Sequence, residues 1–246
     1  MESLTPFQLA YVVVILIASF AVRGSAGFGG LNGPLLMVVL PAKIVIPGLV
    51  FLGIVSSGAI VVRDYRDIDW KAVWRTLPYG IVGTVIGVWL FDKLDANAIE
   101  KGLGAFLFVY GMFALWRIGR APRHSRIPPD VLAGVMGTLS GVIGTMFGAM
   151  AGVFVAVFLD ILELAKSAFR VTMAAILLTL GIIRAVGYLV IDAVTIDVLI
   201  LIGVAVVPIW IGIVLGNRMH ASLNQKGFNR LVGVLFVVIG IFLFVR

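Results

Sequence analysis

The sequence predicts an all-α polytopic membrane protein made of two inverted pseudo-repeats, each a glycine-broken hairpin or broken helix followed by three transmembrane helices. Three observations carry this prediction. The composition is 61% hydrophobic and 13% charged, with a mean hydropathy of +1.16, whereas a soluble domain is nearer half apolar and a quarter charged. Apolar runs of about the 20 residues that a spanning helix needs recur along the chain. Glycine-rich patches interrupt two of these runs.

The first repeat is expected to occupy residues 1–116. Its apolar segments lie at 7–22, 34–62, 72–91 and 98–116. The segment 34–62 is too long for one helix, and we expect Pro41 and Pro47 to divide it because proline interrupts a helix. The result is a short arm at 31–41 and a span at about 44–62. The segment 7–22 and this arm flank the first glycine patch, either as a re-entrant hairpin or as a broken spanning helix.

Residues 117–130 form a basic linker that we expect to be cytoplasmic, because cytoplasmic loops are rich in lysine and arginine. The second repeat, 131–246, has apolar segments at 131–159, 168–190, 194–216 and 227–245. The segment 131–159 either crosses once or returns as a re-entrant hairpin. Loop charge favours the hairpin, which puts thirteen of the 19 lysines and arginines on the cytoplasmic side. A single crossing would move five of them outside: Lys166, Arg170, Arg218, Lys226 and Arg230.

The two halves also match in their glycine register. A shift of 129 residues relates four glycines of each half: Gly83, Gly87, Gly104 and Gly111 fall on Gly212, Gly216, Gly233 and Gly240. Near the start, a shift of 117 places Gly24 on Gly141 and Gly27 on Gly144. Because the loop after residue 62 is expected inside and its counterpart near 191–197 outside, the repeats are inverted. Many secondary transporters use this arrangement for alternating access.

The glycine patches are the candidate site. Glycine costs a helix about 1 kcal/mol relative to alanine, so its density predicts a break or a close backbone contact. Irregular backbone at membrane depth survives only inside protein or beside a cavity. We therefore predict a substrate site at the centre of the bilayer. It comprises Gly24, Gly27, Gly29, Gly30 and Asn32 of the first patch with Gly141, Gly144, Thr145 and Gly148 of the second.

Two arginines fall within apolar segments. Arg23 adjoins the first patch, and an arginine at the bilayer centre costs at least about 2.5–3.5 kcal/mol and usually faces a cavity or a partner. We expect Arg23 to pair with an anionic substrate, helped by nearby amide donors. The alternative is that its side chain reaches the lipid headgroups. Arg184 lies about seven residues from the end of its span, where its long side chain can also reach the headgroups, and is a secondary candidate for the site.

Other functions find less support in the sequence. The two histidines, His124 and His220, lie in basic loops, and their spacing does not fit a zinc site. No glycine loop ends in a nucleotide-binding lysine, and the chain has no cysteine. We therefore expect no catalytic residues, no metal site and no cofactor. The net charge of +7 is interpreted as a set of topology signals and lipid contacts, not as a nucleic-acid surface.

Together these features resemble the TauE/SafE sulfite exporter family. The resemblance extends over essentially the whole chain and is carried by the motif Gly24-x-x-Gly27-x-Gly29-Gly30-x-x-x-Pro34, by the two halves and by the basic linker. It implies export of small sulfur oxyanions and organosulfonates, such as sulfite and sulfoacetate, across the bacterial inner membrane. It also places Gly141, Gly144 and Gly148 on a second copy of the motif, which departs from the tighter glycine cluster of the family.

The expected partners are a small anionic substrate and membrane lipids. No acidic residue falls at mid-span, so the sequence leaves open whether a proton or sodium is the coupling ion. It also leaves open a homodimer. Two further functions remain open at this stage: an uptake permease for another small anion, metal ion or metabolite, and a membrane scaffold subunit that transports nothing.

Overall fold

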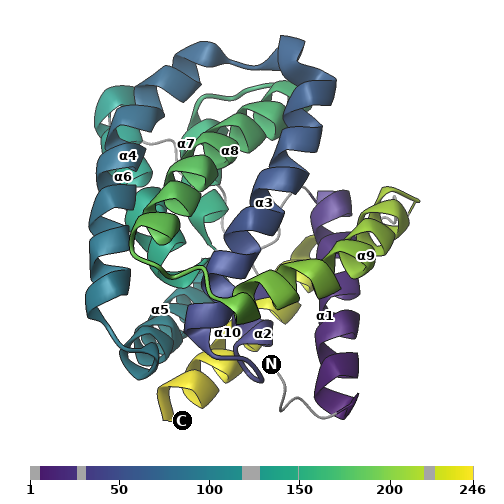
Figure 1. The fold of residues 1–246 in the computed structure, drawn as a ribbon. Coiled ribbons are helices and arrows are strands. Elements are labelled where there is room, and N and C mark those ends of the chain that lie inside the picture. Colours follow the sequence, from purple (N-terminus) through teal and green to yellow (C-terminus); the bar gives the residue numbers. More distant parts are fainter. Residues whose placement is uncertain (1–5, 27–31, 118–127, 149, 219–224, 246) are drawn as a thin grey trace.

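A computed structural model describes residues 6–26, 32–117, 128–148, 150–218 and 225–245. Most of these residues are helical, with no strand among them (Figure 1). The first half contains α1 (Pro6–Ala26), α2 (Asn32–Leu36), α3 (Ala42–Asp64), the 3-10 helix η1 (Tyr65–Asp67), α4 (Trp70–Lys93) and α5 (Ala96–Arg117). The second half contains α6 (Pro129–Phe147), α7 (Ala151–Ile161), α8 (Lys166–Val190), α9 (Ile196–Arg218) and α10 (Gln225–Val245).

Five helical segments in the described residues are long and apolar enough to cross a membrane. They are Ala42–Asp67, Trp70–Lys93, Ala96–Trp116, Pro129–Phe147 and Lys166–Val190. Four shorter apolar stretches accompany them: Phe7–Ala21, Ala151–Ile161, Ile196–Gly212 and Val232–Val245. The prediction of an all-helical, multi-pass membrane protein is therefore confirmed.

The long apolar segment 34–62 is divided only once. Pro41 is the N-cap of α3, so the helix begins where the sequence predicts a break. The expected short arm and span are therefore confirmed, but Pro41 alone makes the break, since Pro47 lies inside α3. At the sixth residue of the helix, proline removes only the amide that would bond to the carbonyl of Lys43. The helix continues past this position to Asp64.

Residues 129–161 form a hairpin, as loop charge predicts. The hydroxyl of Ser140 in α6 donates to the carbonyl of Ala151 at the start of α7, at 3.0 Å. The far end of α7, at Phe158, packs in the same apolar cluster as Leu132 near the start of α6. The second helix therefore runs back along the first. The single-crossing alternative does not fit this arrangement.

The turn of this hairpin has a left-handed backbone. Gly148 has φ +66° and Met150 has φ +68°. Glycine adopts this region at no steric cost, whereas a side chain such as that of Met150 does so rarely. The amide of Gly148 still donates to the carbonyl of Gly144, at 3.1 Å, which ends α6 cleanly. The reversal is thus built from two left-handed residues that flank position 149.

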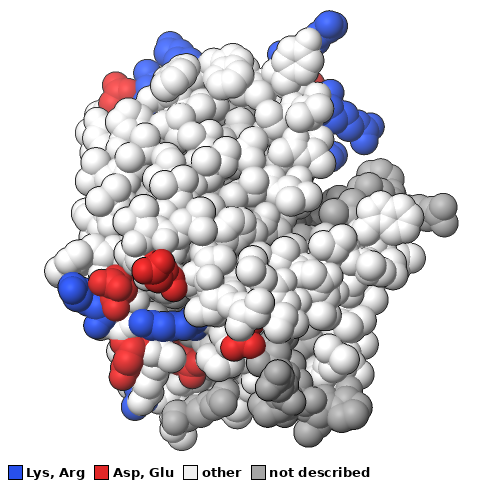
Figure 2. Space-filling view, in the orientation of Figure 1, with Lys and Arg blue, Asp and Glu red and all other residues white. Residues whose placement is uncertain are grey.

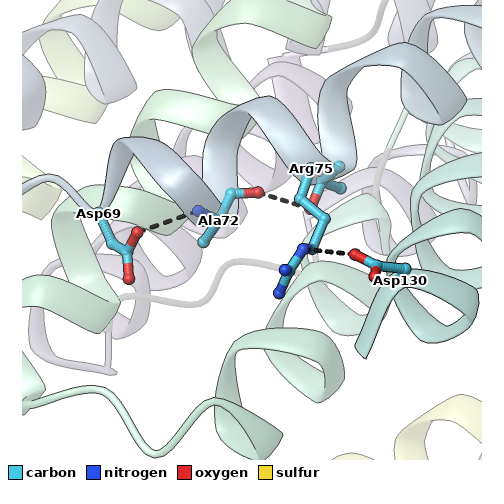
Figure 3. Close-up of polar contacts among 5 residues, drawn as sticks. Asp69, Ala72, Arg75 and Asp130 are labelled. Atoms are coloured by element: carbon cyan, nitrogen blue, oxygen red, sulfur yellow. Dashed lines mark hydrogen bonds and ion pairs between the residues drawn. The ribbon is translucent and has the colours of Figure 1, made fainter. Parts of the chain in front are cut away.

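Charged side chains mark two opposite ends of the molecule, with uncharged surface between them (Figure 2). At one end, which we call the Arg75 end, Arg75 of α4 pairs with Asp130 of α6 at 2.6 Å (Figure 3). There the amide of Asp69 also donates to the hydroxyl of Thr172 in α8, at 2.9 Å. The starts of α4, α6 and α8 therefore lie together at this end.

We call the opposite end the Glu100 end. There the amide of Ala42, at the start of α3, donates to the carboxylate of Glu100 in α5, at 3.1 Å. The rings of Phe91, near the end of α4, and Tyr188, near the end of α8, lie 5.0 Å apart between centroids. The helices α4 and α8 thus run side by side in the same direction.

The helices pack in a small set of pairs (Figure 1). The largest contacts join α4 to α6, α5 to α10, α1 to α9 and α3 to α8, and smaller ones join α4 to α8 and α3 to α9. Glycines line several of these contacts and let backbones approach closely, as is typical of membrane helices. Among the described residues they include Gly83, Gly87, Gly137 and Gly141 between α4 and α6, Gly212 between α9 and α1, and Gly104, Gly111, Gly233 and Gly240 between α5 and α10.

Candidate functional site

The glycines of the second patch have different neighbours. A methyl group at Gly141 would lie 2.6 Å from the backbone nitrogen of Thr84, so Gly141 is where α6 meets the backbone of α4. Gly148 lies in the left-handed turn, and a methyl group there would come 3.1 Å from the α carbon of Ile46 in α3. Both glycines allow close packing of backbone against backbone.

Gly144 has a different neighbour, the guanidinium of Arg184. A methyl group at Gly144 would overlap atom Nη2 of Arg184 and would lie 2.5 Å from the β carbon of Ala151. The guanidinium from α8 therefore sits in the angle between α6 and α7, above a position that only glycine leaves free. The sequence predicts close approach at this glycine, and the described group that approaches it is an arginine of the same chain.

Arg184 is buried, with only 5% of its surface exposed. Its Nη2 donates to the carbonyl of Ser140 at 3.1 Å, and its Nε has no hydrogen-bond partner. The expectation that this side chain could reach the headgroups is wrong for the described structure. The space above Gly144 and the Ser140 carbonyl direct the side chain inward instead.

Thr145 and Tyr188 form a second contact between the same helices. The hydroxyl of Thr145 donates to the carbonyl of Gly141 in its own helix, at 2.7 Å, so it is not free to donate elsewhere. The carbonyl of Thr145 accepts a hydrogen bond from the hydroxyl of Tyr188. Sequence reasoning missed Tyr188, although its position four residues after Arg184 puts both side chains on one face of α8.

The first patch is described only in part. Arg23 and Gly24 lie in the last turns of α1. The side chain of Arg23 lies outside the described part of the structure. Gly27, Gly29 and Gly30 lie outside the described residues. Asn32 begins α2, is 3% exposed, and has an Oδ1 atom without a hydrogen-bond partner. The hydroxyl of Tyr11 in α1 donates to the carbonyl of Leu35 in α2, at 3.0 Å, so α2 lies back against α1.

The described core carries a net positive charge. Arg184 is the one charged side chain among its buried residues. None of the described aspartates and glutamates is buried, and they lie near helix ends. Within the same residues, no group of three histidine, cysteine, aspartate or glutamate side chains could hold a metal ion. Such a core attracts an anion and repels a cation.

The chain matches a family model and a known transporter. The family model described as "Sulfite exporter TauE/SafE" matches residues 11–243. The chain is also similar to "Probable inner membrane transporter protein TsaS" of Comamonas testosteroni, with 26% identity over 187 residues that cover 72% of this chain and 73% of the relative. No solved structure matches the chain.

Proposed function

The chain belongs to the TauE/SafE sulfite exporter family, and we propose that it exports small sulfur-containing anions across the bacterial inner membrane by alternating access. Sulfite, sulfoacetate and related organosulfonates are the proposed substrates, and membrane lipids are the other partners. The protein is a multi-pass membrane transporter in this proposal and carries out no chemical reaction. The proposed substrate site lies at the two glycine breaks.

The observation that carries the proposal is the α6–α7 hairpin. In its turn, Gly148 lies against Ile46 of α3, and Met150 is only 2% exposed. Backbone that is not regular helix can lie at membrane depth only where protein or a water-filled cavity surrounds it. Secondary transporters place their substrate sites at such discontinuous helices. The hairpin therefore favours a transporter over a scaffold subunit.

The helix pairs support the proposed inverted repeats. If α1 to α5 correspond in order to α6 to α10, the contact of α4 with α6 corresponds to that of α9 with α1. The contact of α4 with α8 likewise corresponds to that of α9 with α3, and the pairs α5–α10 and α3–α8 correspond to themselves. Each of these main contacts thus has a counterpart under the exchange of the two halves. Alternating access by rocking one repeat against the other requires this kind of relationship.

Transport by the purified protein in proteoliposomes tests the function. Vesicles loaded with sulfite, sulfoacetate, taurine or thiosulfate should lose at least one of the anionic sulfur compounds faster than protein-free vesicles do. Taurine, which is zwitterionic, should leave more slowly than sulfoacetate, because the described core offers a positive charge and no buried carboxylate. Equal leakage from both kinds of vesicle for every compound would contradict the proposal.

Single cysteines test the inverted topology, since the chain has none of its own. Asp67 and Ala193 lie in corresponding connections, before α4 and before α9, and should be labelled from opposite sides of the membrane. Ser167, at the start of α8, should be labelled from the same side as Asp67. Labelling of Asp67 and Ala193 from one side would rule out inversion.

A further inference from the structure

We propose that Arg184 of α8 and Thr84 of α4 form an anion-binding position at the second glycine patch, which takes the oxyanion group of a small sulfonate or sulfite. This inference rests on the proposed function for the identity of the anion. It names two side-chain donors at the second of the two glycine breaks that form the proposed substrate site.

The first step is the unmet bonding capacity of Arg184. A guanidinium has five N–H donors and a full positive charge. The described structure supplies one carbonyl, that of Ser140, and leaves Nε buried without a partner. Burying a charge costs several kcal/mol unless it is paired and hydrogen-bonded. An anion would supply both the acceptor and the opposite charge.

The second step is that the described protein does not supply this counter-charge. The described carboxylates that form ion pairs lie at the two ends, as in the Arg75–Asp130 pair. None of the described carboxylates pairs with Arg184. The hydroxyl of Tyr188, one turn along α8, is engaged with the carbonyl of Thr145. A bound anion would therefore supply the counter-charge that the described residues do not.

The third step is Thr84, whose hydroxyl is a second buried donor without a hydrogen-bond partner. Thr84 is fully buried, and its Oγ1 has no hydrogen-bond partner. Its backbone meets α6 at Gly141, three residues before Gly144, above which the guanidinium lies. The helices α4 and α8 pack together one turn before Thr84, where Gly80 meets Leu180, and one turn after it, where Val88 meets Gly187. Thr84 and Arg184 thus both contact the Ser140–Thr145 segment of α6.

These donors define the class of ligand. An N–H of a cation and a hydroxyl can both donate to one acceptor group, which must carry negative charge to offset the guanidinium. The oxygens of a sulfonate or sulfite meet both requirements, whereas a metal ion or a protonated amine meets neither. Because Nε is covered in the described structure, the anion reaches it only when the packing around the guanidinium opens. The anion then competes with the Ser140 carbonyl for the guanidinium.

Equilibrium binding to the purified full-length protein tests the proposal, with sulfoacetate and sulfite as probes. Thr84→Val keeps the shape of the side chain and removes only the hydroxyl. We expect it to weaken binding about tenfold, because a hydrogen bond to a charged group is worth at least that much. Arg184→Lys keeps the charge but loses the planar set of donors, and should weaken binding by more than tenfold.

Thr76→Val is the matched control. Thr76 lies in the same helix, is equally buried, and donates its hydroxyl to the carbonyl of Ala72. Its replacement should change the binding constant less than twofold. Size-exclusion profiles and thermal unfolding identify any variant that fails to fold. If Arg184→Lys fails to fold, Thr84→Val alone decides the outcome.

The result separates this site from the proposed function. Wild-type affinity in both Thr84→Val and Arg184→Lys would overturn the site, even if the protein transports sulfoacetate. Anion binding that depends on both residues supports the site. If the same protein then moves none of the sulfur anions in proteoliposomes, the site stands and the export proposal fails.

Discussion

Gly104 of α5 and Gly240 of α10 face each other reciprocally. A methyl group at either glycine would lie 2.8 Å from the carbonyl oxygen of the other. Gly111 and Gly233 meet in the same way further along the pair, with a methyl group at Gly111 2.9 Å from the carbonyl of Gly233. The two contacts exchange under the shift of 129 residues, which carries Gly104 onto Gly233 and Gly111 onto Gly240. The α5–α10 contact is therefore self-complementary.

We predict that Gly104→Ala and Gly240→Ala each lower the free energy of unfolding. The added methyl group meets rigid backbone and not a movable side chain, and overpacking of this kind costs about 1–3 kcal/mol. Gly203→Ala is the control, because a methyl group at this exposed position of α9 would meet nothing within 4 Å. It should be neutral or stabilising by up to about 1 kcal/mol. Equal unfolding midpoints for all three variants in detergent would contradict the close contact.

We predict that Gly144→Ala reduces both anion binding and transport at least tenfold. The methyl group takes the space of the Arg184 guanidinium and also presses on the β carbon of Ala151. The guanidinium must then leave the Ser140 carbonyl. Binding titrations and proteoliposome flux measure the two effects.

Two further variants separate displacement of Arg184 from simple crowding of the hairpin. Ala151→Gly, added to Gly144→Ala, removes the second clash and not the first, so it should leave binding impaired. Recovery of full binding in that double variant would mean that hairpin packing alone was disturbed. Gly134→Ala, earlier in α6, meets the Tyr79 ring at an ordinary 3.5 Å and should bind anions normally.

The polar contacts at the start of α4 should differ in strength (Figure 3). Asp69 caps the helix through the amide of Ala72, at 3.0 Å, and loss of such a cap costs about 1 kcal/mol. The Arg75–Asp130 pair is short, but the Asp130 side chain is 72% exposed, and exposed pairs contribute about 0–1 kcal/mol. We therefore predict that Asp69→Ala lowers stability more than Asp130→Asn. Unfolding at low salt checks the order, and the Asp130→Asn effect should shrink as salt rises, because salt screens an exposed ion pair.

The membrane fold could be predicted because lipid restricts what a chain can do. Long apolar runs, a proline at position 41 and the placement of basic residues each reflect one physical constraint, and each points to a feature of the structure. Pro47 shows where local reasoning fails. Pro47 is buried near the start of α3, where a proline removes one backbone hydrogen bond and the helix continues.

The candidate site was harder to predict, because its contacts join distant parts of the chain. Arg184 and Ser140 are 44 residues apart, and their contact depends on how α8 packs against α6. From sequence alone, a position seven residues from a helix end fits a side chain that reaches the headgroups as well as one that turns inward. The prediction therefore gave Arg23 the leading role. Thr84 carried no signal at all, since a threonine in an apolar helix usually bonds to its own backbone.

The last prediction concerns Arg23 and the first glycine patch. If Arg23 pairs with the substrate, two unit charges about 4 Å apart attract by roughly 4 kcal/mol at an effective dielectric near 20, before desolvation is counted. Arg23→Ala should then weaken anion binding strongly in a folded protein, and Arg23→Lys should restore it only in part because the planar donor set is lost.

Gly29→Ala should abolish transport with little loss of stability, since a methyl group would block the approach of an anion to the backbone amides. Gly104→Ala is its counterpart, with an effect on stability. Normal binding in Arg23→Ala, together with normal transport in Gly29→Ala, would show that the first patch does not hold the anion.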